Sequence, residues 1–116
     1  MQFGRWIPLP DALAAAPKGP GLYQIRVRDG LLAFPRGRSA MVAYGGGEDV
    51  AAALRTFLQS EAAQRAHCLG PLLCRFAPPD PGRSAAECLV GLLSRFVAQF
   101  GAPPPLSPSV SLPQRS

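Results

Sequence analysis

The segment at residues 22–29, Leu-Tyr-Gln-Ile-Arg-Val-Arg-Asp, alternates apolar and polar side chains. Tyr23, Ile25 and Val27 fall on one face of an extended chain, and polar side chains fall on the other. This alternation is typical of a strand with one face buried against a core. The chain must therefore build a sheet, and other elements must cover at least one face of that sheet.

Three further segments have the composition of strands. Residues 31–34 follow a turn signal at 28–30, and residues 40–44 run into three glycines that end the strand. Residues 70–78 form an apolar run with a proline near its start. Four short strands in a chain of 116 residues predict one small sheet.

Two segments have the periodicity of amphipathic helices. The first begins after Glu48 and Asp49, whose carboxylates suit the positive end of a helix dipole. Its predicted buried stripe consists of Val50, Ala53, Leu54, Phe57 and Leu58. The second helix is expected over residues 84–100, with Gly101 placed just beyond its C-terminal end.

A shorter helix is expected over residues 12–16, capped by Asp11 and ended by Pro17. After it, the predicted order of elements is strand, strand, strand, helix, strand, helix. This order predicts an α+β fold, in which helices pack on a small, mostly antiparallel sheet.

The composition of the chain changes near its end. Residues 1–102 carry all the predicted elements, whereas residues 103–116 are rich in proline and serine. We therefore expect one domain at 1–102 and a disordered Pro/Ser-rich tail at 103–116. No apolar run reaches the roughly 18 residues of a membrane span, and the start lacks the pattern of a secretory signal, so a cytoplasmic protein without a membrane partner is expected.

The three cysteines lie at irregular spacing and form no C-x-x-C pair. A zinc site made by His67, Cys68, Cys74 and Cys88 is conceivable, but free thiols among the buried residues are the favoured interpretation. His67 is expected at an exposed or half-buried helix end.

The net charge of +5 is carried by eleven arginines and one lysine. Such a balance favours partners that bear phosphate, because a guanidinium matches two phosphate oxygens at once. Richness in alanine, glycine, proline and arginine is equally typical of proteins from GC-rich genomes. The charge alone therefore permits a nucleic-acid partner without requiring one.

Several segments, in this order, resemble the GIY-YIG nuclease superfamily. Pro-Gly-Leu-Tyr-Gln-Ile at 20–25 resembles the first signature strand, and Met-Val-Ala-Tyr-Gly at 41–45 lies where the second should end. Residues 46–58 resemble the helix that follows, and residues 84–107 resemble the later helix with its acidic residue and its Pro-Leu-Asn-like finish. The resemblance covers roughly residues 6–107.

The resemblance implies a fold and a chemistry. Members of this family cleave phosphodiesters with a divalent metal, so Mg²⁺ or another divalent cation is implied if the site is active. On this basis Tyr23, Tyr44 and Arg55 are the candidate catalytic residues, and Glu87 is the candidate metal ligand. A tyrosine can relay a proton, an arginine can stabilise phosphate charge, and a carboxylate can hold a hard cation. Glu87 also stands three residues after Ser84, which is the spacing of a capping box.

Two alignments of the second signature strand are open. Without a gap, Ala43 occupies the tyrosine position, Tyr44 points to the opposite face of the sheet, and Ala53 occupies the arginine position. With one inserted residue, Tyr44 and Arg55 return to the catalytic positions, but the apolar stripe of the helix is then lost. Because burial is the stronger constraint, we favour the alignment without a gap and expect impaired catalysis.

Four arginines are candidates for contacts with a nucleic-acid backbone: Arg26, Arg28, Arg36 and Arg38. A solvated polar face is the competing interpretation. The favoured function is a nuclease-like domain that acts on or binds nucleic acid, with impaired catalysis. DNA is the candidate partner. The alternatives are an active metal-dependent endonuclease and a non-catalytic protein-interaction module, either of which could depend on a larger protein partner; the sequence leaves the oligomeric state open.

Overall fold

A computed structural model describes residues 2–108 of the chain. Ten elements follow one another along these residues. In chain order they are β1 (Ile7–Pro8), α1 (Leu9–Ala15), β2 (Gly21–Val27), β3 (Leu32–Ala33), β4 (Arg38–Ser39), β5 (Met41–Gly47), α2 (Val50–Leu58), α3 (Glu61–His67), β6 (Leu72–Ala77) and α4 (Ala85–Phe100).

The main sheet has four strands in the order β1-β6-β2-β5, and every neighbouring pair is antiparallel. The strands β3 and β4 form a separate small hairpin. The expected α+β fold, with helices packed on a small antiparallel sheet, is confirmed. The segment at 31–34 does form a short strand, but it pairs with β4 rather than joining the main sheet.

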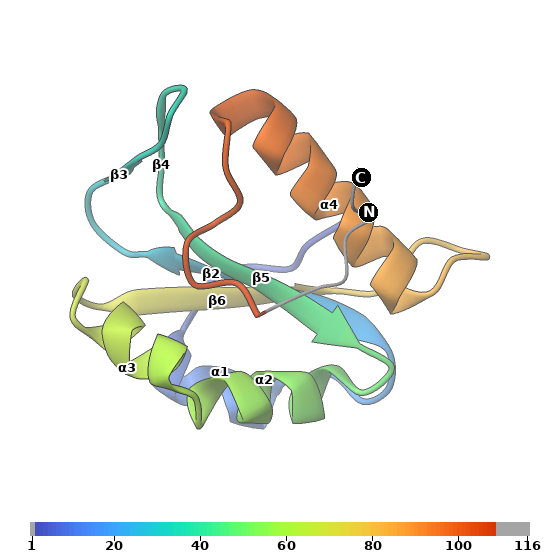
Figure 1. Ribbon diagram of the computed structural model, residues 1–116. Helices are drawn as coiled ribbons and strands as arrows, with labels where there is room; N and C mark the ends of the chain where they lie inside the picture. Colours follow the sequence, from blue (N-terminus) through green and yellow to red (C-terminus); the bar gives the residue numbers. More distant parts are fainter. Residues whose placement is uncertain (1, 109–116) are drawn as a thin grey trace.

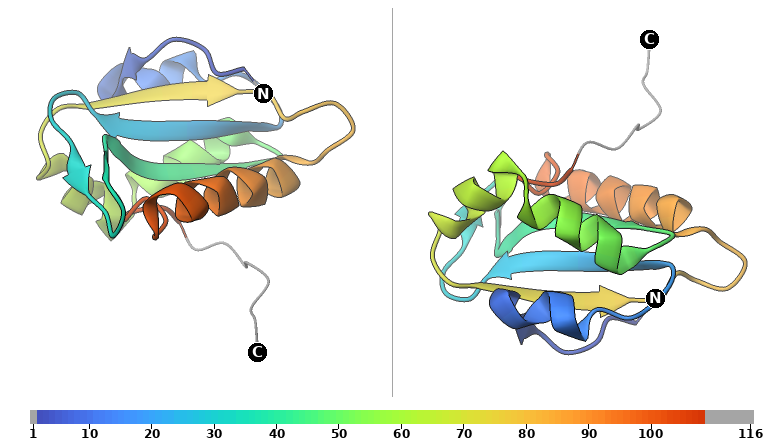
Figure 2. Two further views of the ribbon diagram at one scale, coloured as in Figure 1. Left: turned by 90° about the horizontal axis from the view of Figure 1, so that it is seen from above. Right: turned by 90° about the horizontal axis from the view of Figure 1, so that it is seen from below.

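Helices cover the two faces of the sheet unequally. Figure 1 shows α1, α2 and α3 on one face and α4 alone on the other. Viewed from above, α4 lies along β5 and reaches β2 at Leu22, whereas β6 is not covered by a helix (Figure 2). Because a single helix is narrower than the sheet, this face keeps an area that the N-terminal residues cover only in part.

The two long helices form where their periodicity predicts them. In α2, Val50, Leu54 and Phe57 are buried, and the Asp49 side chain caps the helix by accepting a hydrogen bond from the backbone N–H of Ala52 at 3.1 Å. The helix α4 begins with a Ser84–Glu87 capping box and ends at Gly101, whose φ of 86° is the left-handed conformation that glycine adopts easily.

Two helices differ from the expectation. The first, α1, begins at Leu9, so Asp11 lies in its first turn instead of capping it; Pro10 is tolerated there because the first helical N–H groups have no intrahelical partner. The second, α3, has no counterpart among the predicted elements. It is short, and its buried residues are only alanines, Ala63 and Ala66, which give little apolar periodicity.

The segment after α4 is the clearest correction to the expected domain boundary. Residues 103–108 are not a disordered tail, because Pro104 is fully buried and Leu106 packs against the core. The N–H of Leu106 donates to the carbonyl of Val42 at 2.9 Å, and the N–H of Tyr44 donates to Ser107 Oγ at 3.0 Å. These residues pack because β5 is an edge strand with unpaired backbone groups. The rest of the expected tail, 109–116, lies outside the described residues.

The cysteines agree with the expectation in two of three cases. Cys74 and Cys88 are buried, but Cys68 is exposed just after α3. His67 is exposed at the last position of α3, as expected. Across residues 2–108, no helix has the length and apolar character needed to cross a membrane.

Candidate functional site

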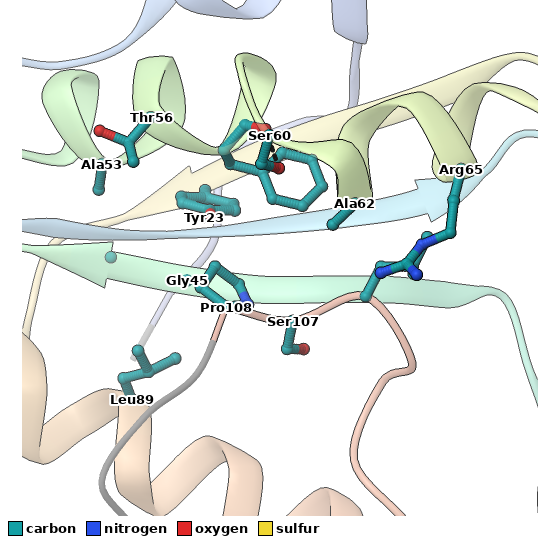
Figure 3. Close-up of a pocket in the computed structure, with 13 residues that line it drawn as sticks. Tyr23, Gly45, Ala53, Thr56, Ser60, Ala62, Arg65, Leu89, Ser107 and Pro108 are labelled. Atoms are coloured by element: carbon teal, nitrogen blue, oxygen red, sulfur yellow. Dashed lines mark hydrogen bonds between the residues drawn. The ribbon is translucent and has the colours of Figure 1, made fainter.

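A pocket of about 490 Å³ opens beside the edge strand β5, between α2 and α3 on one side and the segment 106–108 on the other (Figure 3). Tyr23 of β2 and Leu89 of α4 both contribute to its wall. Of the candidate catalytic residues Tyr23, Tyr44 and Arg55, only Tyr23 lines the pocket.

Tyr23 is almost fully buried, with 1% of its surface exposed. Its register partner on β5 is Gly45, and its ring lies 6.1 Å from the ring of Phe57. Burial raises the pKa of the Tyr23 phenol well above its usual range, and the nearby Cys74 thiol raises it further. The phenol is therefore protonated at neutral pH, so it can donate a hydrogen bond but cannot act as a base.

Tyr44 lies on the other face of the sheet. Its register partner is Gln24, one residue along from Tyr23, and its ring contacts Phe96 of α4 edge-on at 5.5 Å. Burial raises the pKa of Tyr44, and the positive charge of Arg75 partly offsets this. The Tyr23 face carries Ala43 at the corresponding position, as the alignment without a gap requires.

Arg55 and Glu87 also lie away from the pocket. Arg55 is exposed on α2, whereas Ala53 faces the pocket two residues earlier. Glu87 is exposed on α4, whereas Leu89 lines the pocket. The structure therefore does not bring Tyr23, Tyr44, Arg55 and Glu87 around one cleft, and alanine and leucine occupy the places where polar groups were expected.

Glu87 is held in its capping box. Its Oε1 accepts a hydrogen bond from the backbone N–H of Ser84 at 3.2 Å, and its own N–H donates to Ser84 Oγ at 3.1 Å. The hydrogen bond from the Ser84 backbone lowers the pKa of the Glu87 carboxyl, and the Ser84 side chain and the charge of Arg83 act in the same direction. The carboxylate is thus used locally, at the start of α4.

This geometry gives a prediction for pH dependence. A lowered pKa in the folded state means that Glu87 stabilises the fold above its ordinary pKa of 4.5, and that this contribution is lost as the pH falls through the lowered value. We expect Glu87→Gln to lower stability at about pH 7 and to have little effect at about pH 2, measured by denaturant unfolding. Glu48→Gln, at another exposed carboxylate, is the control. An equal pH dependence in both variants would contradict the capping role.

The four arginines of the expected basic patch do not form one free surface. Arg28 pairs with its neighbour Asp29 at 3.0 Å. Arg36 donates to the carbonyls of Val97 and Ala98 at 3.1 and 2.7 Å, so it caps the C-terminal end of α4. Arg38 is exposed on β4, in the same hairpin as Arg36 and away from the main sheet. Of these four arginines, only Arg26 lies on the part of the sheet face that α4 leaves uncovered.

The structure adds three residues to Arg26 that the sequence did not single out. The guanidinium of Arg75, on β6, lies 4.3 Å from the ring centroid of Trp6 and 4.8 Å from that of Phe3. Arg26 lies 5.4 Å from the Trp6 ring. We call Phe3, Trp6, Arg26 and Arg75 the arginine–aromatic surface. The alternation in Leu-Leu-Cys-Arg-Phe-Ala does place Arg75 opposite buried Cys74, but only the sheet order brings it beside Arg26.

Burial lowers the pKa of Arg75; the nearby Tyr44 raises it and the positive charge of Arg26 lowers it. Arg75 Nε donates to Gln24 Oε1 at 2.7 Å, which fixes the guanidinium over the sheet. Among residues 2–108, neither Arg26 nor Arg75 takes part in an ion pair. Two neighbouring guanidiniums without a carboxylate favour the approach of an anion.

A divalent cation has weak support in this geometry. Within residues 2–108 there is no group of three or more His, Cys, Asp or Glu side chains placed to hold a metal ion. Glu87 stands alone as an expected ligand, and its carboxylate is hydrogen-bonded to Ser84. A Mg²⁺ site normally combines one or two carboxylates with water and substrate phosphates, so Glu87 in its present place does not fit one built around the Tyr23 pocket.

The fold and the site define a small α+β domain with a helix-lined pocket and an open, arginine-bearing sheet face. No family model, curated protein or solved structure matches the chain. The resemblance to GIY-YIG nucleases therefore rests on the sequence segments alone, and the function is a matter of proposal.

Proposed function

We propose that this chain is a GIY-YIG nuclease-like domain that binds nucleic acid through the arginine–aromatic surface and does not cleave it. The observation that carries the proposal is the pair of guanidiniums, Arg26 and Arg75, side by side beside Trp6 on the part of the sheet face that α4 leaves uncovered. Charged guanidiniums packed against aromatic rings distinguish the arginine–aromatic surface from an ordinary solvated surface.

The chemistry of the surface suits a nucleic acid better than a simple anion. Each guanidinium can donate two parallel hydrogen bonds to one phosphate. Guanidiniums lie over the rings of Trp6 and Phe3, so an unpaired base would stack on the ring surface that they leave exposed. A sheet face with aromatic side chains is a common platform for single strands. We therefore expect single-stranded DNA or RNA to bind more tightly than duplex.

The absence of cleavage follows from the residues on the Tyr23 face of β5 and α2. The proposal takes the alignment without a gap, in which Ala43 and Ala53 stand at two catalytic positions. Neither side chain can relay a proton or stabilise phosphate charge. A protonated, deeply buried Tyr23 cannot replace them.

The test is fluorescence anisotropy with a labelled oligonucleotide of about 20 nucleotides, single-stranded or duplex, between about 50 and 200 mM salt. We expect salt-dependent binding by the unmodified protein. Arg26→Ala with Arg75→Ala should weaken it at least about tenfold, since each lost charged contact contributes about 1.5–3 kcal/mol. The matched control replaces Arg55 and Arg95, two exposed arginines elsewhere, and thus removes the same charge.

Three results would contradict the proposal. Equal losses in the two double variants would indicate non-specific attraction by net charge. Nicking of a plasmid with Mg²⁺ would favour the active endonuclease. No binding at low salt would leave the protein-interaction module as the better hypothesis.

A further inference from the structure

We propose that the Tyr23 pocket is a binding site for a small organic acid, a ligand with an apolar body and one carboxylate. The site is separate from the arginine–aromatic surface, and the proposal does not depend on nucleic-acid binding. It rests on three features of the pocket: an unpartnered buried hydroxyl, a polar lining made of hydrogen-bond donors, and an apolar floor.

The unpartnered hydroxyl belongs to Tyr23. Among the described residues, no group accepts a hydrogen bond from the Tyr23 hydroxyl or donates one to its oxygen. The side chain is nonetheless buried, with 1% of its surface exposed. A buried hydroxyl without a partner costs free energy, so buried hydroxyls are almost always hydrogen-bonded. The ring lies across Gly45, on the wall of the pocket, where a ligand that brings an acceptor atom can satisfy it.

The other polar side chains of the pocket are Thr56, Ser60, Arg65 and Ser107; the Ser60 hydroxyl is engaged, since it donates to the carbonyl of Phe57, and the other three can donate to a ligand. Arg65, on α3, is exposed and takes part in no ion pair among residues 2–108. Ser107 Oγ accepts from the N–H of Tyr44, which leaves its own hydrogen available. No acidic side chain lines the pocket. A lining of donors with one fixed positive charge selects an anion over a cation or a neutral amine.

Apolar side chains make up most of the rest of the lining, to which Thr56 and Ser60 also contribute. Phe57 and Ala53 come from α2, Leu89 from α4, and Leu106 from the segment after α4. In Figure 3, Arg65 lies at one end of the pocket, Leu89 lies toward the other end, and Ser107 lies between them. This polarity along the pocket places a carboxylate near Arg65 and a hydrocarbon body near Leu89. A volume of about 490 Å³ is within the range of small-molecule sites.

The test uses octanoate as the probe, followed by amide chemical shifts of the full chain. Octanol keeps the hydrocarbon and removes the charge, and inorganic phosphate keeps a charge and removes the hydrocarbon. We expect octanoate to shift the amides of Gly45, Ala62 and Ser107, and to bind at least about tenfold more tightly than either of the other probes.

Two variants locate the contacts. Arg65→Ala should weaken octanoate binding about tenfold, whereas Arg55→Ala, at an exposed arginine outside the pocket, should leave it unchanged. Tyr23→Phe, which keeps the ring, should weaken binding about three- to tenfold. Both pocket variants should leave nucleic-acid binding unchanged, so a failure here and a failure of the proposed function are distinguishable.

Equal binding of octanol would show an apolar pocket without anion recognition and would overturn the proposal. Binding of phosphate as tight as octanoate would show an anion on Arg65 alone and would overturn it as well. The proposal is also overturned if Arg55→Ala weakens octanoate binding as much as Arg65→Ala does, or if the amides that shift on octanoate binding lie outside the pocket.

Discussion

Replacing Gly45 with alanine is expected to lower the free energy of unfolding by about 2–3 kcal/mol. A Cβ at this position would overlap Cζ and the hydroxyl oxygen of Tyr23 and would lie 2.6 Å from Cε2. The ring cannot turn aside easily, because it is buried and packs against Phe57. The alanine therefore forces a shift of β5 or of the ring.

Denaturant unfolding monitored by circular dichroism measures this effect. Gly47→Ala is the matched control: it lies on the same strand, and a Cβ there meets no atom within 4 Å. In the double variant Gly45→Ala with Tyr23→Leu, the shorter side chain should tolerate the new methyl, so the two changes should cost less than the sum of the single changes. Similar losses from Gly45→Ala and Gly47→Ala would show that backbone flexibility, not the Tyr23 ring, explains the glycine.

A larger loss, about 3–5 kcal/mol, is expected from Phe96→Ala. Phe96 is 5% exposed and joins the helix α4 to two other parts of the fold. Its ring centroid lies 5.2 Å from that of Phe34, 5.5 Å from that of Tyr44, and 4.5 Å from that of Phe100. Alanine would leave a cavity between α4, β5 and the β3–β4 hairpin.

Because a small domain is stable by only about 5–15 kcal/mol, this change should lower the melting temperature by many degrees. Calorimetry of Phe96→Ala measures it, and Leu31→Ala, at a leucine that is 61% exposed, is the control. A loss below about 1 kcal/mol would show that α4 is held to the sheet by other contacts.

The sequence was informative wherever periodicity and capping act locally. Alternation predicted β2, the apolar stripe predicted α2, and the Ser84 and Gly101 signals predicted both ends of α4. It failed for α3, whose inner side is made of alanines, and for the residues after α4, which fold because of an edge strand elsewhere in the chain.

The expected site was harder to predict, since it depends on which residues face each other across strands. The place of Tyr44 in the second signature strand suggested that it lies beside Tyr23. In the sheet, Tyr44 pairs with Gln24, and because neighbouring residues of a strand point to opposite faces, its side chain lies on the face opposite to Tyr23. The burial of Val50 and Leu54 was the better guide, because it fixes Ala53 toward the pocket and Arg55 toward solvent. Arg75 lies beside Arg26 only because β6 pairs with β2, and no local sequence pattern predicts this pairing.

The edges of the sheet limit how another protein can approach this domain. The segment containing Leu106 and Ser107 occupies backbone groups in the middle of the outer side of β5, and the other edge strand, β1, has only two residues, the second of which is Pro8. A peptide that binds by adding a strand needs a free row of such groups. Within residues 2–108, recognition by strand addition is therefore disfavoured, and a partner must use side chains on the open face or in the pocket instead.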